Sequence, residues 1–170
     1  MLNMKIAAVT LLVGLLSGIL PPGAFFDSQG KPKTLWSMSK GQPLVVIVTK
    51  GYWCPSCMAQ LALLDTKQIH RQRATVVGLN QDHPGLNYEV EEQLELNFPI
   101  LSDPEGKWLQ QRGLWDEEKE HPIPAILFFD HCGDLVYERK GRTPGELDDD
   151  LILEVIKKIQ QTKRDCPNFT

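Results

Sequence analysis

The sequence predicts an α/β sandwich with a mixed central sheet and helices on both faces. Two β-branched apolar runs, residues 43–49 and 75–80, are typical of strands that are covered on both faces. Each run is followed by a stretch with the periodicity of a helix. Two later extended runs, residues 125–129 and 135–139, flank a cluster of turn-forming residues and predict a hairpin. Strands that alternate with helices and end in a hairpin and a helix favour this fold class.

The other elements follow from local periodicity and from capping residues. Residues 25–36 predict two short extended pieces around a turn, and residues 55–73 predict one helix with Pro55 in its first turn. The remaining expected elements are a helix at 84–96, a strand at 98–101, a helix capped by Asp103 with Pro104 in its first position, and a final helix to 163 that opens with the capping-box spacing of Thr143 and Glu146.

Length and composition predict one globular domain. The chain has 170 residues, of which 42% are hydrophobic and 24% charged, and its net charge is −4. This length supplies one well-buried core and not two ordinary ones. The basic residues form no stripe and the charge balance is acidic, so no nucleic-acid partner is expected.

The first twenty residues differ from the rest of the chain. Residues 6–20 carry no charge, and the Pro-Pro-Gly sequence that follows ends any helix. A helix of this length reaches roughly 22 Å, which is short of a hydrocarbon core of about 30 Å. We therefore expect residues 1–20 to be a signal peptide or signal anchor, with the domain at 21–170, an extracytoplasmic location and a possible membrane tether. The alternative is a packed N-terminal helix.

The sequence Gly-Tyr-Trp-Cys-Pro-Ser-Cys at 51–57 places two cysteines at the predicted start of a helix. Thiol–disulfide exchange needs an attacking thiolate and a second thiol that resolves the mixed disulfide. The helix N-terminus favours the thiolate of Cys54, while Cys57 lies one turn inside. Cys54 is thus the expected nucleophile and Cys57 the resolving residue, with Trp53 and Tyr52 lining the approach. A structural zinc site lacks a second ligand pair, and a structural staple across so short a loop restrains little unfolded-chain entropy.

The order of these motifs resembles that of a known family. The cysteine motif after the strand at 43–49, the sequence FPILSDPEG at 98–106 and the sequence IPAILFFDHCGDLVYERKG at 123–141 are similar to thioredoxin-like proteins of the alkyl hydroperoxide reductase and thiol-specific antioxidant (AhpC/TSA) type. They also resemble the related membrane-tethered thiol–disulfide oxidoreductases. The resemblance covers roughly residues 21–160.

The resemblance implies a three-layer thioredoxin-like sandwich and a redox activity without organic cofactor or metal. It implies that Pro124 is the family's cis-proline, which faces the cysteine pair and aligns an extended substrate. The residues alone predict a trans proline at an ordinary strand start. The expected partners are protein disulfides or dithiols and an upstream redox protein. Residues 118–121, Glu-Lys-Glu-His, are expected as a solvated loop before Pro124; the alternative is that they lie near Cys54 and bias its pKa.

Two alternatives remain for the activity. The first is a peroxiredoxin-like thiol peroxidase, but peroxiredoxins carry a proline seven residues and a threonine or serine three residues before the attacking cysteine, where this chain has Ile47 and Gly51. The second is a copper-binding protein, since soft thiolates suit Cu(I). The family's copper chaperones, however, space their cysteines by three residues. We therefore expect a thiol–disulfide oxidoreductase.

The remaining cysteines, Cys132 and Cys166, have no motif between them. In a thioredoxin-like fold, Cys132 lies in the hairpin turn far from the redox motif, and the final helix returns the chain to that end. A structural disulfide between them is therefore expected; the alternative is two unpaired cysteines, one buried and one in the C-terminal tail. Because such a bond persists only in an oxidising compartment, it would agree with an extracytoplasmic location.

Overall fold

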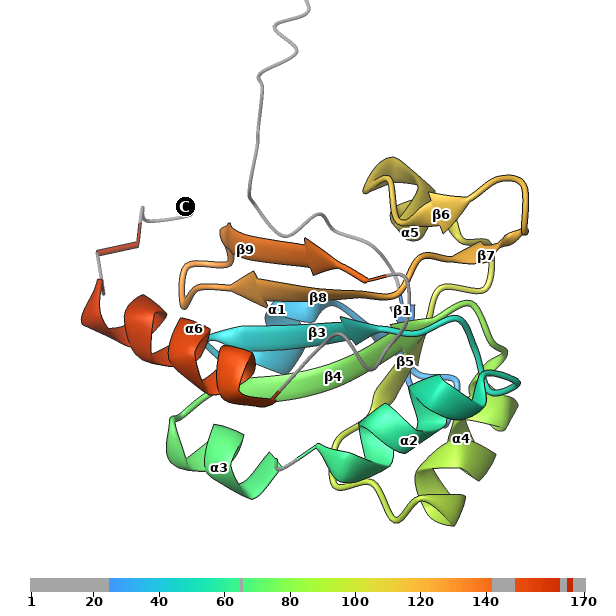
Figure 1. Cartoon of the computed structure of the whole chain (residues 1–170), viewed down its shortest axis with the longest axis horizontal. Helices are drawn as coiled ribbons and strands as arrows, with labels where there is room; N and C mark the ends of the chain where they lie inside the picture. The colour runs from blue at the N-terminus through green and yellow to red at the C-terminus, as the bar shows by residue number, and fades with distance from the viewer. Residues whose placement is uncertain (1–24, 65, 142–148, 163–164, 167–170) are drawn as a thin grey trace, which may run out of the picture.

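The computed structural model describes residues 25–64, 66–141, 149–162 and 165–166 (Figure 1). The predicted signal or anchor at 1–20 and the predicted capping box of the last helix lie outside these residues. Within the described residues, no helix combines the length and apolar character needed to cross a membrane.

Nine strands and six helices follow one another along the described chain. The strands are β1 (Phe25–Phe26), β2 (Pro32–Lys33), β3 (Leu44–Val48), β4 (Thr75–Asn80), β5 (Ile100–Ser102), β6 (Trp115–Asp116), β7 (His121–Pro122), β8 (Ala125–Phe129) and β9 (Leu135–Lys140). The helices are α1 (Leu35–Ser39), α2 (Pro55–Leu63), α3 (Thr66–Arg71), α4 (Pro84–Gln93), α5 (Lys107–Gln111) and α6 (Asp149–Gln161).

Seven strands form one mixed sheet in the order β2-β1-β5-β4-β3-β8-β9. The central strands β3, β4 and β5 are parallel, whereas β8 pairs antiparallel with β3 and β9 antiparallel with β8. A separate two-stranded ribbon, β6 with β7, lies outside the sheet. Because β3 is central and parallel to β4, its carboxyl end opens onto the edge where α/β proteins place their sites.

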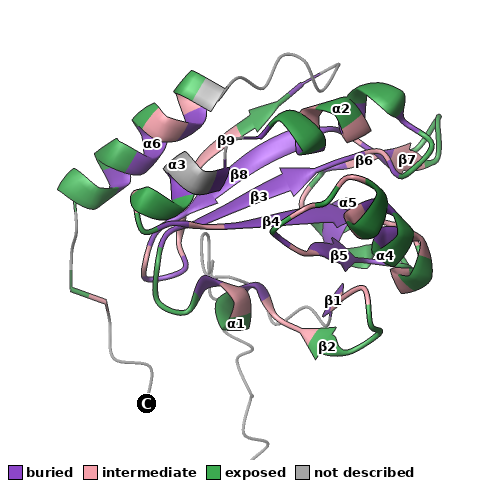
Figure 2. Cartoon of the chain, turned by 90° about the horizontal axis from the view of Figure 1, so that it is seen from below, coloured by how far each residue is buried: buried purple, intermediate pink, exposed green. Residues whose placement is uncertain are grey.

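Helices cover both faces of the sheet, as Figures 1 and 2 show. Alternate residues of the central strands point to opposite sides: Val45 and Ile47 of β3 pack in one core with side chains from α2, α3, α4 and α6. Val46 and Val48 pack in the other core with side chains from α1 and α5. The predicted α/β sandwich with a mixed sheet and helices on both faces is confirmed.

Several predicted boundaries are wrong. The single helix expected over 55–73 is two helices, because Leu64 takes an extended conformation (φ −63°, ψ 118°) and ends α2. The extended piece expected up to residue 36 instead turns into α1, which Thr34 and Ser37 start with a reciprocal capping box.

The helix expected to be capped by Asp103 starts later. Gly106 is the N-cap of α5, in the left-handed region at φ 62°, and Pro104 lies in the turn before it. The Asp103 carboxylate still serves the helix, since its Oδ2 accepts a hydrogen bond from the Leu109 amide at 3.0 Å. The prediction of Asp103 as the N-cap and Pro104 as the first helical residue is therefore wrong, although Asp103 accepts a hydrogen bond from the first turn of α5.

Candidate redox site

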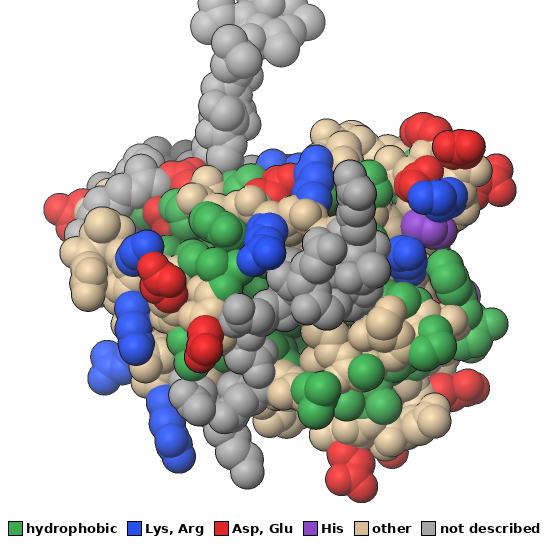
Figure 3. All heavy atoms as spheres, viewed as in Figure 1, with side chains coloured by type: hydrophobic (Ala, Val, Ile, Leu, Met, Phe, Trp, Pro, Cys, Tyr) green, Lys and Arg blue, Asp and Glu red, His purple; other side chains and the backbone are tan. Residues whose placement is uncertain are grey.

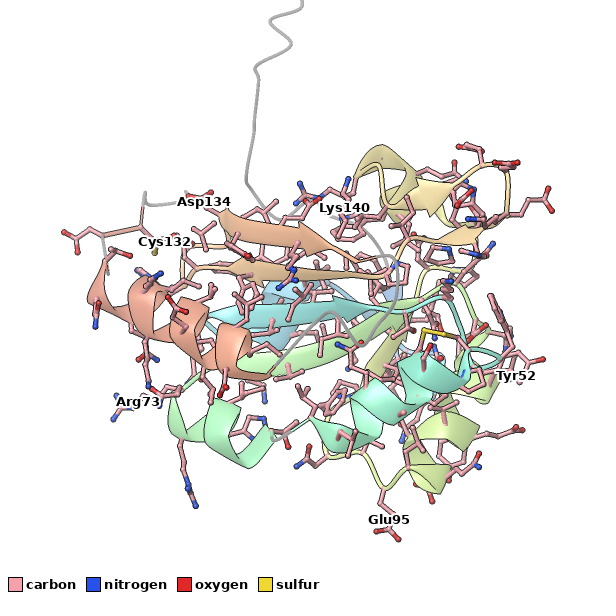
Figure 4. The ribbon with its side chains drawn as sticks, in the orientation of Figure 1. Tyr52, Arg73, Glu95, Cys132, Asp134 and Lys140 are labelled. Carbon is pink, nitrogen blue, oxygen red and sulfur yellow. A yellow bond between two sulfur atoms is a disulfide. The ribbon has the colours of Figure 1, made fainter. Side chains whose placement is uncertain are left out.

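The cysteine pair lies where β3 ends and α2 begins. Cys54 is the N-cap of α2 in an extended conformation, and Pro55 occupies the first helical turn, where its missing amide hydrogen costs nothing. Cys54 and Cys57 form a disulfide with a Cα–Cα distance of 5.3 Å. Figure 4 shows this bond in yellow near Tyr52. The predicted placement of both cysteines at a helix start is confirmed.

The two sulfurs differ in access. Cys54 is 5% exposed and Cys57 is fully buried. The Cys57 amide donates to Cys54 Sγ at 3.3 Å, and Ser56 Oγ lies 3.5 Å from the same sulfur. An amide and a hydroxyl directed at Cys54 favour a negative sulfur there once the bond is reduced. The geometry thus fits Cys54 as the attacking and Cys57 as the resolving residue.

Two aromatic side chains flank the pair at the surface. Tyr52 and Trp53 are each 51% exposed. The Trp53 ring lies 5.6 Å from the His121 ring, centroid to centroid, which brings the β6–β7 ribbon against the cysteine loop. The run 118–121 was expected as a loop, whereas His121 belongs to β7. His121 therefore lies beside the site, which was the alternative to a purely solvated run for residues 118–121.

A buried polar network holds the loop before the cysteines. Asp82 Oδ2 accepts hydrogen bonds from the Tyr52 amide at 2.6 Å and from Asn80 Nδ2 at 3.1 Å. Asn80 and Asn87 exchange hydrogen bonds at 2.9 and 3.0 Å, and Asn87 donates to Ser102 Oγ at 2.9 Å. This series of hydrogen bonds connects β5, α4 and β4 to the cysteine loop. Polar residues just after β4, next to the carboxyl end of β3, are the signal that could have predicted it.

Replacing Asp82 with asparagine should change how stability depends on pH. Burial is the main cause that raises the pKa of Asp82, and the Tyr52 amide hydrogen bond offsets part of the rise. A carboxyl whose folded pKa lies above its unfolded pKa loses stabilising free energy as pH rises through the folded value. We therefore expect the free energy of unfolding of Asp82→Asn to increase relative to that of wild type as the pH rises above about 4, the ordinary pKa of an Asp carboxyl. Denaturant unfolding at several pH values measures this difference, and a difference that shrinks as pH rises would contradict it.

Gly51 occupies a position where a side chain does not fit. Its φ is +141°, in the region that favours glycine. A Cβ there would lie 2.9 Å from Trp53 Nε1 and 3.0 and 3.2 Å from the two carboxylate oxygens of Asp82. The residue three positions before Cys54 is thus fixed as glycine by the surrounding loop.

Replacing Gly51 with alanine should destabilise the protein by about 1–3 kcal/mol, because the backbone is strained and Trp53 or Asp82 must move. Chemical denaturation measures the loss. The matched control is Gly85→Ala, where the added Cβ meets only His83 Nδ1, at 3.6 Å. Equal effects of the two substitutions would contradict the assignment.

The expectation of a cis bond before Pro124 is wrong. The described residues contain no cis peptide bond. Ala125 pairs with Val48, so Pro124 lies at the same sheet edge as the cysteine loop. Pro124 is buried, and its carbonyl accepts a hydrogen bond from Gly141 at 2.9 Å, which extends the β8–β9 ladder. The trans bond suits a strand start, and a role of Pro124 in presenting substrate stays a prediction.

The second cysteine pair lies at the opposite end of the sheet. Cys132, in the β8–β9 turn, forms a disulfide with Cys166, which follows α6, at a Cα–Cα distance of 5.2 Å. Figure 4 shows Cys132 at the end of the molecule remote from Tyr52. The predicted pairing is confirmed. Among the described residues, the one group of three potential metal ligands is His131 with these two cysteines, and not the pair at 54 and 57.

Comparisons with known proteins agree with this architecture. The Haemophilus influenzae protein Bcp, named as a peroxiredoxin, is 30% identical over 82 residues, which are 47% of this chain and 53% of that protein. The chain thus matches about half the length of this curated relative. The solved structures of Xanthomonas campestris bacterioferritin comigratory protein (15% identity, TM-score 0.71) and Mycobacterium tuberculosis peroxidoxin BcpB (19%, 0.70) share the fold. The matched regions cover 80% of this chain and 90% of the former, and 84% and 94% for the latter.

The thioredoxin-like fold expected from the sequence is therefore confirmed. A family model described as AhpC/TSA family matches residues 19–138, which is most of the domain and includes the cysteine motif, β8 and all but the last two residues of β9. This chain belongs to the AhpC/TSA family.

Proposed function

We propose that the protein is a thiol–disulfide oxidoreductase that acts on protein disulfides through Cys54 and Cys57. In the reducing direction, the Cys54 thiolate attacks one sulfur of a substrate disulfide, forms a mixed disulfide and releases one substrate thiolate. The Cys57 thiolate then attacks Cys54 Sγ, closes the Cys54–Cys57 bond and releases the second substrate thiolate. Two electrons pass to the substrate, and an upstream redox protein returns them by the reverse exchange.

One observation carries the proposal. The resolving sulfur lies within bonding distance of the attacking sulfur, one turn inside the same helix, and it is fully buried. A mixed disulfide on Cys54 is therefore resolved inside the protein, with no rearrangement of distant elements. This arrangement suits repeated exchange with bulky disulfide substrates, because only Cys54 has to be reached from outside.

A thiol peroxidase is the second candidate, and the comparisons favour it. The relatives are named as peroxiredoxins, and the Xanthomonas structure is described in terms of alkyl peroxide reduction. Against it stands position 51, where the family's peroxidases carry a hydroxyl and this chain has a glycine without room for a Cβ. A peroxide would approach Cys54 without a side-chain hydroxyl from that position to orient it.

Parallel assays of the two activities decide between the candidates. Insulin disulfide reduction with dithiothreitol and consumption of hydrogen peroxide are measured for wild type and for Cys54→Ser. We expect insulin reduction that Cys54→Ser abolishes, and peroxide consumption that stays close to that of the variant. Rapid peroxide turnover that Cys54→Ser removes would establish the peroxidase instead.

We also propose that the protein works outside the cytoplasm. The Cys132–Cys166 disulfide supports this proposal because such bonds persist in oxidising compartments, and the apolar run at 6–20 supports it independently. Fractionation of the native host tests it: the protein should separate with the cell envelope and carry this bond, and recovery from the cytoplasm with both thiols free would contradict it.

A further inference from the structure

The stretch from Gly51 to Leu64 contains no Asp, Glu, Lys, Arg or His, although much of it faces outward. Leu63 is 78% exposed, and with Tyr52 and Trp53 it supplies half of the exposed large hydrophobic side chains of the described residues. We call the exposed apolar residues of this stretch the apolar strip; they are Tyr52, Trp53, Pro55, Ala59, Ala62 and Leu63.

The apolar strip is unusual for a surface helix of this protein. The outward face of α6 carries charged residues such as Glu154, Lys157 and Lys158, as a solvated helix face normally does. Figure 3 shows hydrophobic side chains over α2 and over the loop before it, with acidic groups beside them. A contiguous apolar surface that adjoins a reactive group marks an interaction site.

Acidic residues lie near both ends of the apolar strip. At the Leu63 end, Glu95 lines the same hollow as Ala62, and α4 before it exposes Glu89 and Glu92. At the Trp53 end, the ring contact with His121 brings in the β6–β7 ribbon, whose turn exposes Glu117, Glu118 and Glu120. Its one lysine, Lys119, pairs with Asp116 at 3.4 Å. Figure 2 shows the β6–β7 ribbon next to α2, with α4 on the other side of the ribbon.

We infer that the apolar strip and its two acidic borders form the docking surface for a redox partner protein whose reactive cysteine lies in an apolar patch surrounded by Lys and Arg. This inference rests on the proposed function. Cys54 is only 5% exposed, so a partner sulfur reaches it only when the partner's surface fits closely against the surface around Cys54. An apolar centre with a charged rim is the usual anatomy of a transient interface, and a basic rim on the partner complements the carboxylates. Anionic lipid headgroups would be repelled by the same carboxylates, which favours a protein over a membrane.

Disulfide-cyclised synthetic peptides test the inference. Three peptides share one cysteine pair and differ in their flanks: Leu and Phe with outer Lys, Leu and Phe with outer Glu, and Ser and Gly with outer Lys. Each rate of reduction by the dithiol form of the full chain is divided by the rate with hydroxyethyl disulfide, a small uncharged disulfide. We expect the apolar, Lys-bordered peptide to react about tenfold faster than the other two on this relative scale, which corresponds to a modest difference in docking free energy.

Two variants locate the effect on the surface. Leu63→Ser should lower the relative rate of the apolar, Lys-bordered peptide by about fivefold, as loss of an interface anchor does, whereas Val136→Ser, an exposed apolar residue of β9, should leave it unchanged. Added salt should lower the relative rate of the apolar, Lys-bordered peptide, because the Debye length shortens from about 30 to about 8 Å between about 0.01 and 0.15 M salt. In the triple variant Glu117→Gln, Glu118→Gln, Glu120→Gln this decrease should be smaller.

The outcomes separate the docking surface from the function itself. If hydroxyethyl disulfide does not react with the Cys54–Cys57 dithiol, the proposed function fails. If it reacts and the three peptides have equal relative rates, or if Leu63→Ser and Val136→Ser behave alike, the function stands and the docking surface is wrong. Binding of the protein to phosphatidylserine vesicles that Leu63→Ser abolishes would replace the protein partner by a membrane.

Discussion

Replacing Cys57 with serine should stop turnover and leave the substrate covalently attached to Cys54. Without the resolving thiolate, the mixed disulfide has no internal attacker, since Ser56 and the serine at 57 offer hydroxyls in place of a thiol. We expect the rate of insulin disulfide reduction to fall by about 10³-fold, as removal of an essential catalytic group does. Non-reducing electrophoresis and intact mass spectrometry measure the trapped adduct.

The matched variant is Cys54→Ser, which should lose activity to the same extent without forming the adduct. Cys54 is 5% exposed and Cys57 is fully buried, so we expect a bulky substrate to form the mixed disulfide with Cys54. An adduct of equal yield on Cys57 in the Cys54→Ser variant would reverse the two assignments. Unimpaired turnover of Cys57→Ser would show that resolution comes from outside the pair.

Breaking the Cys132–Cys166 bond should cost about 3–4 kcal/mol of unfolding free energy. The bond joins residues 34 positions apart, and in the chain-entropy model a cross-link over this separation removes that much entropy from the unfolded state. In a protein of this length the loss lowers the melting temperature by about 10 °C. Denaturant unfolding of the Cys54→Ser, Cys57→Ser background, with and without dithiothreitol, isolates this bond because no other cysteine pair remains.

The control is the same background with Cys132→Ala and Cys166→Ala, whose stability should not respond to dithiothreitol. Cys132 is buried and Cys166 half-buried in a segment after α6, so the bond ties the end of the described chain to the hairpin turn. A stability that is independent of reductant in both proteins would contradict the structural role of the bond.

The sheet could be predicted from the sequence because its strands carry strong local signals. Residues 44–48 and 75–80 are β-branched runs buried on both faces, and the hairpin of β8 and β9 is bounded by turn formers. Helix limits were predicted less well. The helical periodicity of the sequence continues across Leu64, but the extended backbone of Leu64 ends α2. Thr66, the first residue of α3, donates a hydrogen bond from its hydroxyl to Asn97 Oδ1 at 2.6 Å. Asn97 belongs to the α4–β5 connection, and local sequence does not encode such a tertiary contact.

The cysteine chemistry could be predicted because the spacing of Cys54 and Cys57 fixes their geometry at a helix start. The second disulfide could be predicted only through the topology of the fold. The contacts that hold the cysteine loop could not be predicted from local sequence. Asp82 lies about 30 residues from Tyr52, and His121 lies about 70 residues from Trp53. These contacts follow from the strand order and from the position of the β6–β7 ribbon. The expectation of a cis bond before Pro124 came from the family resemblance alone, whereas the residues themselves favour an ordinary strand start.

A redox titration of the Cys54–Cys57 pair tests the central claim most directly. The full chain is equilibrated with mixtures of reduced and oxidised dithiothreitol, alkylated, and analysed by peptide mass spectrometry. The account predicts one reversible two-electron transition assigned to Cys54 and Cys57 together, with Cys132–Cys166 changing independently of it. Titration of Cys54 without Cys57, or a pair that never closes at any accessible ratio, would contradict exchange through this pair.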